Sequence, residues 1–372
     1  MATILLDQYQ QQPLWADEFD ACKKDIFSFK TDIDAQVLRA HSVAQVEVQA
    51  QAQGCIEDIC RDTFGESPCR VVPLKPGACH VLFQVGLPDH CQYIIKFRIF
   101  PVQHRAFEFL NEHWVAQYRS EGGFKSPEVI RVDVSRKLCG WDYQILELLS
   151  GIGLKDIEDD ASQFIDGDIL FKVGQSLAHI HQVQGQCFGF PKVVALLNSG
   201  FQGMVGNHAS WESYLRTRLD EHIAVCYDNQ AIDRQEAGYI ERLFADFQYP
   251  QSRASILHGD LGNHNIVILK NNEIGFLDWE DMIVGDPVYD LAYWGTFMRD
   301  DQISGLLKGY VVQKALPDNV EVCYWVYYLR IALAKTVYRL RLGVPQRPDR
   351  PPASLRIQKA IKHIKGMAEV RV

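Results

Sequence analysis

The sequence predicts an α+β protein of two lobes with a cleft between them. Strand patterns dominate the first part of the chain, where two strands are expected over 81–100 and one over 143–149. After that, the hydrophobic spacing is mainly helical and is interrupted by one strand hairpin over 265–279. The chain has 372 residues, of which 47% are hydrophobic and 23% charged, so it can form two lobes of ordinary globular composition.

The N-terminal part is expected to contain a helix, two strands and a second helix, in that order. The first helix is predicted over 46–64 from its hydrophobic spacing. The segment "VLFQVGLPDHCQYIIKFRIF" (81–100) contains a proline and an aspartate that favour a turn over 87–90. In the second strand, Lys96 projects from the face opposite to the apolar residues on either side of it. The second helix is expected over 103–119.

The C-terminal part begins after a buried strand over 143–149. A helix with one apolar face is predicted over 168–183, and another helix starts near Trp211. The predicted hairpin turns at two asparagines, 271–272, which tolerate positive φ. From about residue 287 onward, the pattern is helical.

Composition excludes several classes of protein. A net charge of −9 and a pI near 5.7 argue against a nucleic-acid binder, and an acidic surface suits either a cationic small substrate or an ordinary cytosolic protein. The ten cysteines form no CxxC pair, so a zinc site is not expected. The longest apolar stretch is interrupted by Arg330, Lys335 and Arg339, and the N-terminus does not have the pattern of a signal peptide. We therefore expect a cytoplasmic protein that binds neither nucleic acid nor a membrane.

The segment "LHGDLGNHNIVI" (257–268) contains the strongest chemical signal. Asp260 and Asn265 are five residues apart, and Asp278 follows at the end of the hairpin, which would return it beside Asn265. A carboxylate and an amide oxygen placed together could hold Mg²⁺, which prefers oxygen ligands and shares them with substrate phosphates. Asp260 could then accept or orient the proton of an attacking hydroxyl. This division of roles is typical of phosphoryl transfer.

The same segment, followed by "GFLDWEDMIVGDPVYDLA", resembles the signature of the aminoglycoside phosphotransferase family, whose members are relatives of the protein kinases and phosphorylate small molecules. The resemblance covers roughly residues 70–345, and the Gly262-Asn263 pair is similar to the hygromycin phosphotransferase variety. It implies a two-lobed, protein-kinase-like α+β fold, with an antiparallel sheet and helices in the N-lobe and a mostly helical C-lobe. The implied divisions are an N-terminal helical extension, an N-lobe, a hinge and a C-lobe over 1–65, 66–145, 146–150 and 151–372.

The resemblance also implies roles for residues of the N-lobe. Lys96 would contact the α and β phosphates and would be held by a helix glutamate, either Glu112 or Glu108, of which Glu112 better fits the family's spacing. The loop around Gly77 stands where a phosphate-covering loop is expected, although it has a single glycine. Backbone groups of Glu147–Leu149 would pair with the adenine edge.

Other polar residues near the motif allow two interpretations. His258 could be a second catalytic group, or it could support the loop by hydrogen bonding, which is the favoured interpretation. Glu280 and Asp281 add negative charge beside the predicted metal ligand Asp278 and could reach the metal through water. Asp286 and Asp290 are interpreted as structural, with Asp286 capping the helix that follows it.

Taken together, these features predict a kinase that moves the γ-phosphate of ATP or GTP to a hydroxyl of a small molecule, with two Mg²⁺ ions as cofactors. An aminoglycoside-type antibiotic is the leading acceptor, and a small metabolite or natural-product intermediate is the alternative. A catalytically dead nucleotide-binding protein is less favoured, because Lys96, Asp260, Asn265 and Asp278 are all present. The absence of an Asp-Phe-Gly motif disfavours a protein kinase. Either a monomer or a homodimer is compatible with the sequence.

Overall fold

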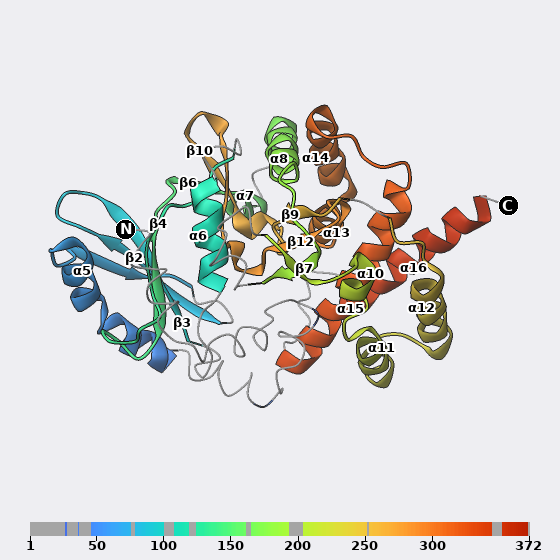
Figure 1. Cartoon of the computed structure of the whole chain (residues 1–372), viewed down its shortest axis with the longest axis horizontal. Helices are drawn as coiled ribbons and strands as arrows, with labels where there is room; N and C mark the ends of the chain where they lie inside the picture. The colour runs from blue at the N-terminus through green and yellow to red at the C-terminus, as the bar shows by residue number, and fades with distance from the viewer. Residues whose placement is uncertain are drawn as a thin grey trace.

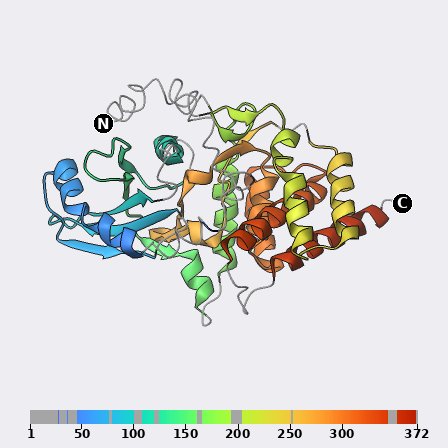
Figure 2. The same cartoon turned by 90° about the horizontal axis from the view of Figure 1, so that it is seen from below.

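A sheet-rich lobe and a helical lobe lie side by side in the protein, as Figure 1 shows. Figure 2 shows the same division from below, with the strands of the N-terminal half on one side and the C-terminal helices on the other. The predicted α+β class with two lobes is thereby confirmed. The computed structural model describes residues 27, 36, 46–75, 79–99, 108–118, 124–160, 165–192, 204–250, 253–343 and 352–370.

The N-lobe is built on a five-stranded antiparallel sheet with the strand order β1-β2-β3-β5-β4. Its strands are β1 (Arg70–Pro73), β2 (His80–Gly86), β3 (Gln92–Arg98), β4 (Val129–Asp133) and β5 (Asp142–Glu147). β2 and β3 are the two strands predicted within 81–100, and His90 takes a left-handed φ of 69° in the turn between them. In this register Lys96 lies opposite Leu82 on one side and Gln144 on the other.

Two helices cover the two faces of this sheet. Helix α5 (Ile56–Phe64) shares one buried apolar cluster with Ile95 and Phe97, and α6 (Glu108–Tyr118) shares another with the β4 strand. Because side chains alternate along β3, Lys96 projects toward α6. The helix predicted over 46–64 is interrupted by a turn at Gly54, since glycine is a weak helix former. The divisions of the chain at residues 65, 145 and 150 stay a prediction.

Two small sheets follow the N-lobe. One has the order β11-β10-β6 and contains the predicted hairpin, whose turn includes Asn272 with a left-handed φ of 56°. The other has the order β8-β7-β12-β9, and the sequence did not predict it because its short strands lie far apart in the chain and no tight turn joins them. The strands are β6 (Gly151–Gly153), β7 (Phe188–Pro191), β8 (Gly206–His208), β9 (Ser255–Leu257), β10 (Ile266–Leu269), β11 (Ile274–Phe276) and β12 (Ile283–Gly285).

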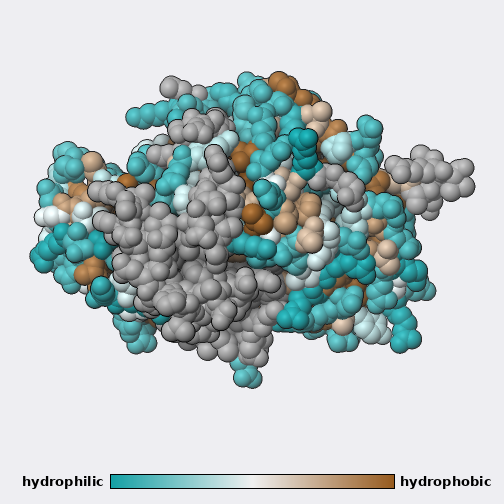
Figure 3. Space-filling view, in the orientation of Figure 1, coloured by the Kyte–Doolittle hydropathy of each residue, from teal (hydrophilic) through white to brown (hydrophobic). Residues whose placement is uncertain are grey.

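The remaining elements are mainly α-helices, as predicted for the C-terminal part. They are α7 (Leu154–Asp159), α8 (Gly167–Ile180), α10 (Trp211–Leu215), α11 (Leu219–Asp228), α12 (Arg234–Asp246), α13 (Val288–Gly295), α14 (Asp300–Gln313), α15 (Val320–Leu342) and α16 (Ala353–Val370). Hydrophilic residues cover most of the described surface that Figure 3 shows. Among the described residues, none of the helices is both long and apolar enough to cross a membrane.

Arg330 of α15 is buried in the C-lobe core and is fully engaged by hydrogen bonds. Its guanidinium donates to the carbonyl oxygens of Leu215 and Thr217 and lies 3.0 Å from Nδ1 of His222. The ring of Phe27 stacks on the guanidinium at 3.8 Å. Since arginine carries only donors, His222 must accept at Nδ1, and it is therefore neutral.

We expect His222 to make the protein sensitive to acid. Burial, and then the charge of Arg330, lower the pKa of His222 from 6.5 to about 2. In the unfolded chain the imidazole binds a proton below about pH 6.5, whereas in the folded chain it does not. Stability is therefore complete above pH 6.5 and should fall by up to about 1.4 kcal/mol per pH unit below it. Urea unfolding between pH 7 and 4.5 measures this slope, which should be shallower for His222→Asn; equal slopes would contradict the prediction.

Candidate active site

The loop after β9 is held in place by one buried carboxylate. Asp290 of α13 accepts hydrogen bonds from the backbone N–H groups of His258 and Gly259, at 2.7 and 3.0 Å. Gly259 has a left-handed φ of +79°, and a Cβ atom there would lie 1.9 Å from the carbonyl oxygen of Asp281. Glycine is thus required for the loop to pass directly against the 279–281 segment. The geometry agrees with the structural role predicted for Asp290.

Removing this carboxylate should unfold the loop or the whole domain. Asp290 also lies 3.2 Å from Nε2 of His181, so Asp290→Ala would leave two backbone donors and an imidazole without their buried acceptor. We expect a loss of about 3 kcal/mol or more in the free energy of unfolding, because hydrogen bonds to charged groups are worth about 1.5–3 kcal/mol each. Denaturant unfolding measures it, with Asp290→Asn as a milder control that keeps one oxygen. A loss below about 1 kcal/mol would show that the loop does not depend on this anchor.

His258 is buried and supports the same loop through its side chain. Its Nε2 atom lies 2.9 Å from the carbonyl oxygen of Leu277, and a carbonyl only accepts, so this nitrogen carries the proton. Nδ1 then accepts from the backbone N–H of Asp260 at 3.4 Å. The ring packs against Trp279 at a tilt of 36°, with 4.6 Å between ring centroids. Both ring nitrogens are occupied within the protein, which favours the supporting interpretation over a catalytic one.

Asp260 presents its carboxylate at the end of this loop, with the side chain 22% exposed. Tyr293 of α13 donates its hydroxyl to Oδ1, and Nε2 of His264 lies 3.5 Å from Oδ2. The partial exposure leaves room for an incoming group on the carboxylate. An ionised carboxylate in this position can accept a proton from a hydroxyl that approaches it.

Asn265 and Asp278 are brought together by the hairpin, as predicted from their spacing. The backbone N–H of Leu277 donates to the carbonyl of Asn265 at 2.9 Å, which places Asp278 immediately beyond that contact. The side-chain Nδ2 of Asn265 donates to the carbonyl of Asp260 at 2.9 Å, so Oδ1 is the atom that is left to ligate or accept. Asp278 takes a left-handed φ of 61° and keeps its side chain 40% exposed. One amide oxygen and one accessible carboxylate fit the oxygen ligands that Mg²⁺ prefers.

Lys96 lies at the centre of three carboxylates contributed by two other segments. Its Nζ atom lies 2.7 Å from Glu112, 2.6 Å from Asp278 and 3.1 Å from Glu280. The side-chain Nδ2 of Asn111, on α6, donates a hydrogen bond to the backbone carbonyl of Glu280 at 3.2 Å and so joins the same two segments. The ammonium therefore connects β3, α6 and the segment after β11 at one point.

The two candidate glutamates of α6 have different partners. Glu112 accepts from Lys96, whereas Glu108, one turn earlier on the helix, accepts from Nη1 of Arg98 at 2.9 Å. Lys96 and Arg98 lie two residues apart on β3, so both project toward α6 and each meets one glutamate. His80 of β2 lies 3.7 Å from Glu108 and 3.3 Å from Glu280, which links the two pairs into one buried network.

Lys96 and the three carboxylates around it, those of Glu112, Asp278 and Glu280, do not balance in charge. Burial by itself lowers the pKa of Lys96, but the carboxylates of Asp278, Glu112 and Glu280 outweigh it and hold that pKa well above its usual value. Burial raises the pKa of Glu112 in spite of the neighbouring ammonium. Three carboxylates around one ammonium are an excess of negative charge, which a divalent cation beside Asp278 would reduce.

The hinge predicted over 146–150 begins within the last two residues of β5 and continues beyond it. The backbone N–H of Glu147 donates to the carbonyl of Glu128 at 2.8 Å, and that of Leu148 lies 3.4 Å from the carbonyl of Gln92. Among the residues that the structure describes, Leu149 has no hydrogen-bond partner, so its backbone groups are available to a ligand. Gly77 lies outside the described residues, and the phosphate-covering loop stays a prediction.

Sequence reasoning missed two residues that contact the Asp260 carboxylate, Tyr293 and His264. His264 is inside the quoted motif, and its position four residues after Asp260 was a usable signal. Tyr293 lies three residues after Asp290 on the same helix, so it faces the same loop from one turn further along. That spacing could have identified Tyr293 only after Asp290 had been placed beneath the loop.

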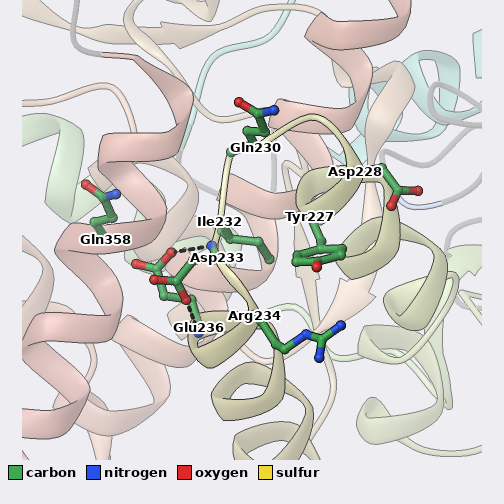
Figure 4. Close-up of a pocket in the computed structure, with 9 residues that line it drawn as sticks. Tyr227, Asp228, Gln230, Ile232, Asp233, Arg234, Glu236 and Gln358 are labelled. Carbon is green, nitrogen blue, oxygen red and sulfur yellow. Dashed lines mark hydrogen bonds between the residues drawn. The ribbon is translucent and has the colours of Figure 1, made fainter.

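A surface pocket of about 630 Å³ lies elsewhere, between the α11–α12 connection and α16 (Figure 4). Its polar groups include Asp233 and Glu236, which cap α12 through reciprocal hydrogen bonds of 2.8 and 2.9 Å. The pocket contains none of the predicted site residues. Helix capping therefore accounts for two of the carboxylates in this pocket.

The fold and the site together define a class, the two-lobed phosphotransferases, in which a strand lysine meets the aspartate that a hairpin brings beside the Asp-Asn loop. Residues 72–321 match the phosphotransferase enzyme family, and because this match spans more than half of the chain, the protein belongs to that family. This confirms the resemblance stated from the motifs. No curated protein matches the chain by sequence.

Solved structures with the same fold have low sequence identity to this chain. A thermostable mutant of aminoglycoside phosphotransferase APH(4)-Ia, in ternary complex with ADP and hygromycin B, has a TM-score of 0.58 at 16% identity, covering 83% of this chain and 98% of that one. A putative fructosamine-3-kinase from Thermobifida fusca YX-ER1 has a TM-score of 0.58 at 15% identity, covering 82% and 98%. Macrolide 2'-phosphotransferase MphH from Brachybacterium faecium has a TM-score of 0.57 at 15% identity, covering 83% of this chain and 97% of that one. These similarities confirm the protein-kinase-like fold.

Proposed function

We propose that the protein transfers the γ-phosphate of ATP to a hydroxyl group of a small molecule. The observation that carries this proposal is the convergence of Lys96, Asp260, Asn265 and Asp278, which come from three separate segments of the chain. Phosphoryl transfer needs a positioned nucleophile and stabilised phosphate charge, and these four residues provide both. The ADP complex of a similar structure supports a nucleotide donor, and GTP is the alternative.

The residues divide the reaction between them. The acceptor hydroxyl is oriented by Asp260, which takes its proton as the oxygen attacks the γ-phosphorus and the bond to the β-phosphate oxygen breaks. Lys96, held by Glu112, binds the α and β phosphates in exchange for its contact with Asp278. Bound Mg²⁺, which we expect as two ions, would be held by Asn265 and Asp278 and would neutralise phosphate charge. Glu280 lies close enough to Asp278 to assist, and Glu147 and Leu149 would hold the adenine.

An aminoglycoside-type antibiotic is the acceptor that we propose first. The motif similarity to the hygromycin phosphotransferase variety supports it, as does the hygromycin B complex of a structure with the same fold. The chain's net charge of −9 is compatible with a cationic acceptor. A small metabolite is the second candidate, because a putative fructosamine-3-kinase has the same TM-score of 0.58 as that complex.

A phosphotransfer screen distinguishes these acceptors. Purified protein with MgATP is tested against aminoglycosides including hygromycin B, and in parallel against simple amino alcohols, sugars and a fructosamine. Strong stimulation of ADP release by one aminoglycoside, with the phosphorylated product seen by mass spectrometry, is the expected result. Stimulation confined to a sugar or fructosamine would instead establish the metabolite kinase.

The same screen tests whether the protein is a kinase at all. A catalytically dead nucleotide-binding protein would be stabilised by ATP in a thermal-shift experiment but would release no ADP with any acceptor. The intact set of Lys96, Asp260, Asn265 and Asp278 leads us to expect turnover. Binding of ATP without turnover, in the presence of Mg²⁺ and the whole acceptor panel, would contradict the proposal.

A further inference from the structure

The hydroxyl of Tyr293 donates a hydrogen bond to Oδ1 of Asp260 from outside the loop over 257–268 that carries this aspartate. Tyr293 lies on α13, 33 residues beyond Asp260, and its ring is buried, with 2% of its surface exposed. Burial and the neighbouring carboxylate of Asp260 raise its pKa well above the ordinary value, so the phenol keeps its proton. Its hydroxyl is therefore a permanent donor to Oδ1.

The ring of Tyr293 is fixed from several sides. Nζ of Lys335, on α15, lies 3.7 Å from the centroid of the Tyr293 ring and 3.4 Å from that of Phe297. The Phe297 ring, in the turn just after α13, packs with its centroid 6.0 Å from that of Tyr293. Tyr289 packs against the ring one turn earlier at the same distance, 6.0 Å. A ring held in this way cannot turn its hydroxyl away from Asp260 without disturbing two helices.

The two oxygens of the Asp260 carboxylate are thus in different situations. Oδ1 is occupied by a buried phenol, whereas Oδ2 lies 3.5 Å from His264, a side chain that is 43% exposed. A general base needs one oxygen directed at the acceptor hydroxyl, and a carboxylate free to rotate would spend part of its time misdirected. The loop anchors the Asp260 backbone, but a contact on the carboxylate itself is what fixes its rotation.

We propose that Tyr293 is a positioning residue for Asp260, holding Oδ1 so that Oδ2 receives the proton of the acceptor hydroxyl. The inference rests on the proposed phosphotransferase function and assigns that site a residue outside the motif. The cation of Lys335 over the ring strengthens the phenol as a donor, because it draws electron density from the ring. Tyr293 acts through Asp260 and binds neither nucleotide nor metal.

The test compares Tyr293→Phe with wild type in MgATP hydrolysis, where water is the acceptor, and in transfer to any acceptor that the screen identifies. The variant keeps the packed ring and loses the hydroxyl. We expect kcat to fall about 10- to 100-fold, the usual value of a hydrogen bond to a charged group, with the KM for ATP unchanged within about twofold. A fall in kcat without a change in KM is not expected from a purely structural loss.

Tyr327→Phe is the matched control. Tyr327 is equally buried and donates its hydroxyl to another aspartate, Asp286, at 3.0 Å, away from the Asp260 loop. Both variants should lower Tm by a similar amount, but only Tyr293→Phe should lower kcat. A double-mutant cycle completes the test. In a protein that already carries Asp260→Asn, adding Tyr293→Phe should lower kcat by less than about twofold.

The outcomes separate the inference from the function on which it rests. Equal kcat values for Tyr293→Phe and Tyr327→Phe, or additive losses in the cycle, would overturn the positioning role while leaving the kinase intact. A Tyr293→Phe protein that does not fold would also overturn it, since the hydroxyl would then be structural. A wild-type protein with no more activity than Asp260→Asn toward water and every acceptor would overturn the proposed function itself.

Discussion

Replacing Asp260 by asparagine should lower kcat by about 10² to 10⁴-fold, the usual contribution of a general base. The amide has nearly the same shape as the carboxylate, so it can still accept the hydroxyl of Tyr293 and keep the loop in place. What it loses is the ability to take a proton. The loss should therefore appear in kcat, while the affinity for ATP stays close to that of wild type.

Steady-state phosphate transfer measures kcat, and titration with MgATP measures the affinity. Asp228→Asn is a suitable control, because it makes the same chemical change at an exposed position of α11 beside the surface pocket of Figure 4. Its activity should be that of wild type. If Asp260→Asn retained activity within about threefold of wild type, Asp260 would not be the base.

Replacing Asp278 by alanine should abolish turnover that depends on Mg²⁺, a loss of about 10³-fold or more. Asp278 is the charged member of the proposed ligand pair, and its side chain is 40% exposed. Without it, Asn265 alone would remain to bind the ion. The fold should survive, because Lys96 keeps its contacts with Glu112 and Glu280.

A titration of transfer activity with Mg²⁺ gives the result, together with a thermal melt that verifies folding. Glu280→Gln provides the comparison, since it removes a carboxylate 3.1 Å from the same ammonium without removing the proposed ligand. That variant should keep its dependence on Mg²⁺ even if its rate falls. A folded Asp278→Ala protein with an unchanged response to Mg²⁺ would remove Asp278 from the metal site.

Much of the fold was predictable because it depends on local spacing. The β2–β3 hairpin follows from alternating apolar residues around a turn former, and the hairpin between Asn265 and Asp278 follows from two short apolar segments on either side of an Asn-Asn turn. Helices such as α8 follow from apolar residues at spacings of three and four. The four-stranded sheet of β7, β8, β9 and β12 was not predictable, since its strands are short and are separated by long stretches of chain, with no tight turn to indicate which of them pair.

The choice between Glu108 and Glu112 shows what spacing leaves open. The two residues lie one turn apart on α6, and both are within reach of β3 by sequence alone. The structure assigns Glu112 to Lys96 and Glu108 to Arg98, because the rotation of α6 against the sheet sets which turn faces which strand residue. That rotation depends on apolar packing spread over the whole lobe.

By itself, the sequence determined which chemical groups are present and in what order they follow one another in the segment 257–268. The placement of Asp260 just before the hairpin, with Asn265 and Asp278 at its two ends, is a property of neighbouring residues, and the family resemblance was read from this segment. The tertiary structure alone decided that Lys96 meets Asp278 from 182 residues away and that Tyr293 of α13 reaches Asp260 in its loop. Such contacts arise from the packing of whole elements, and no local pattern in the chain specifies them.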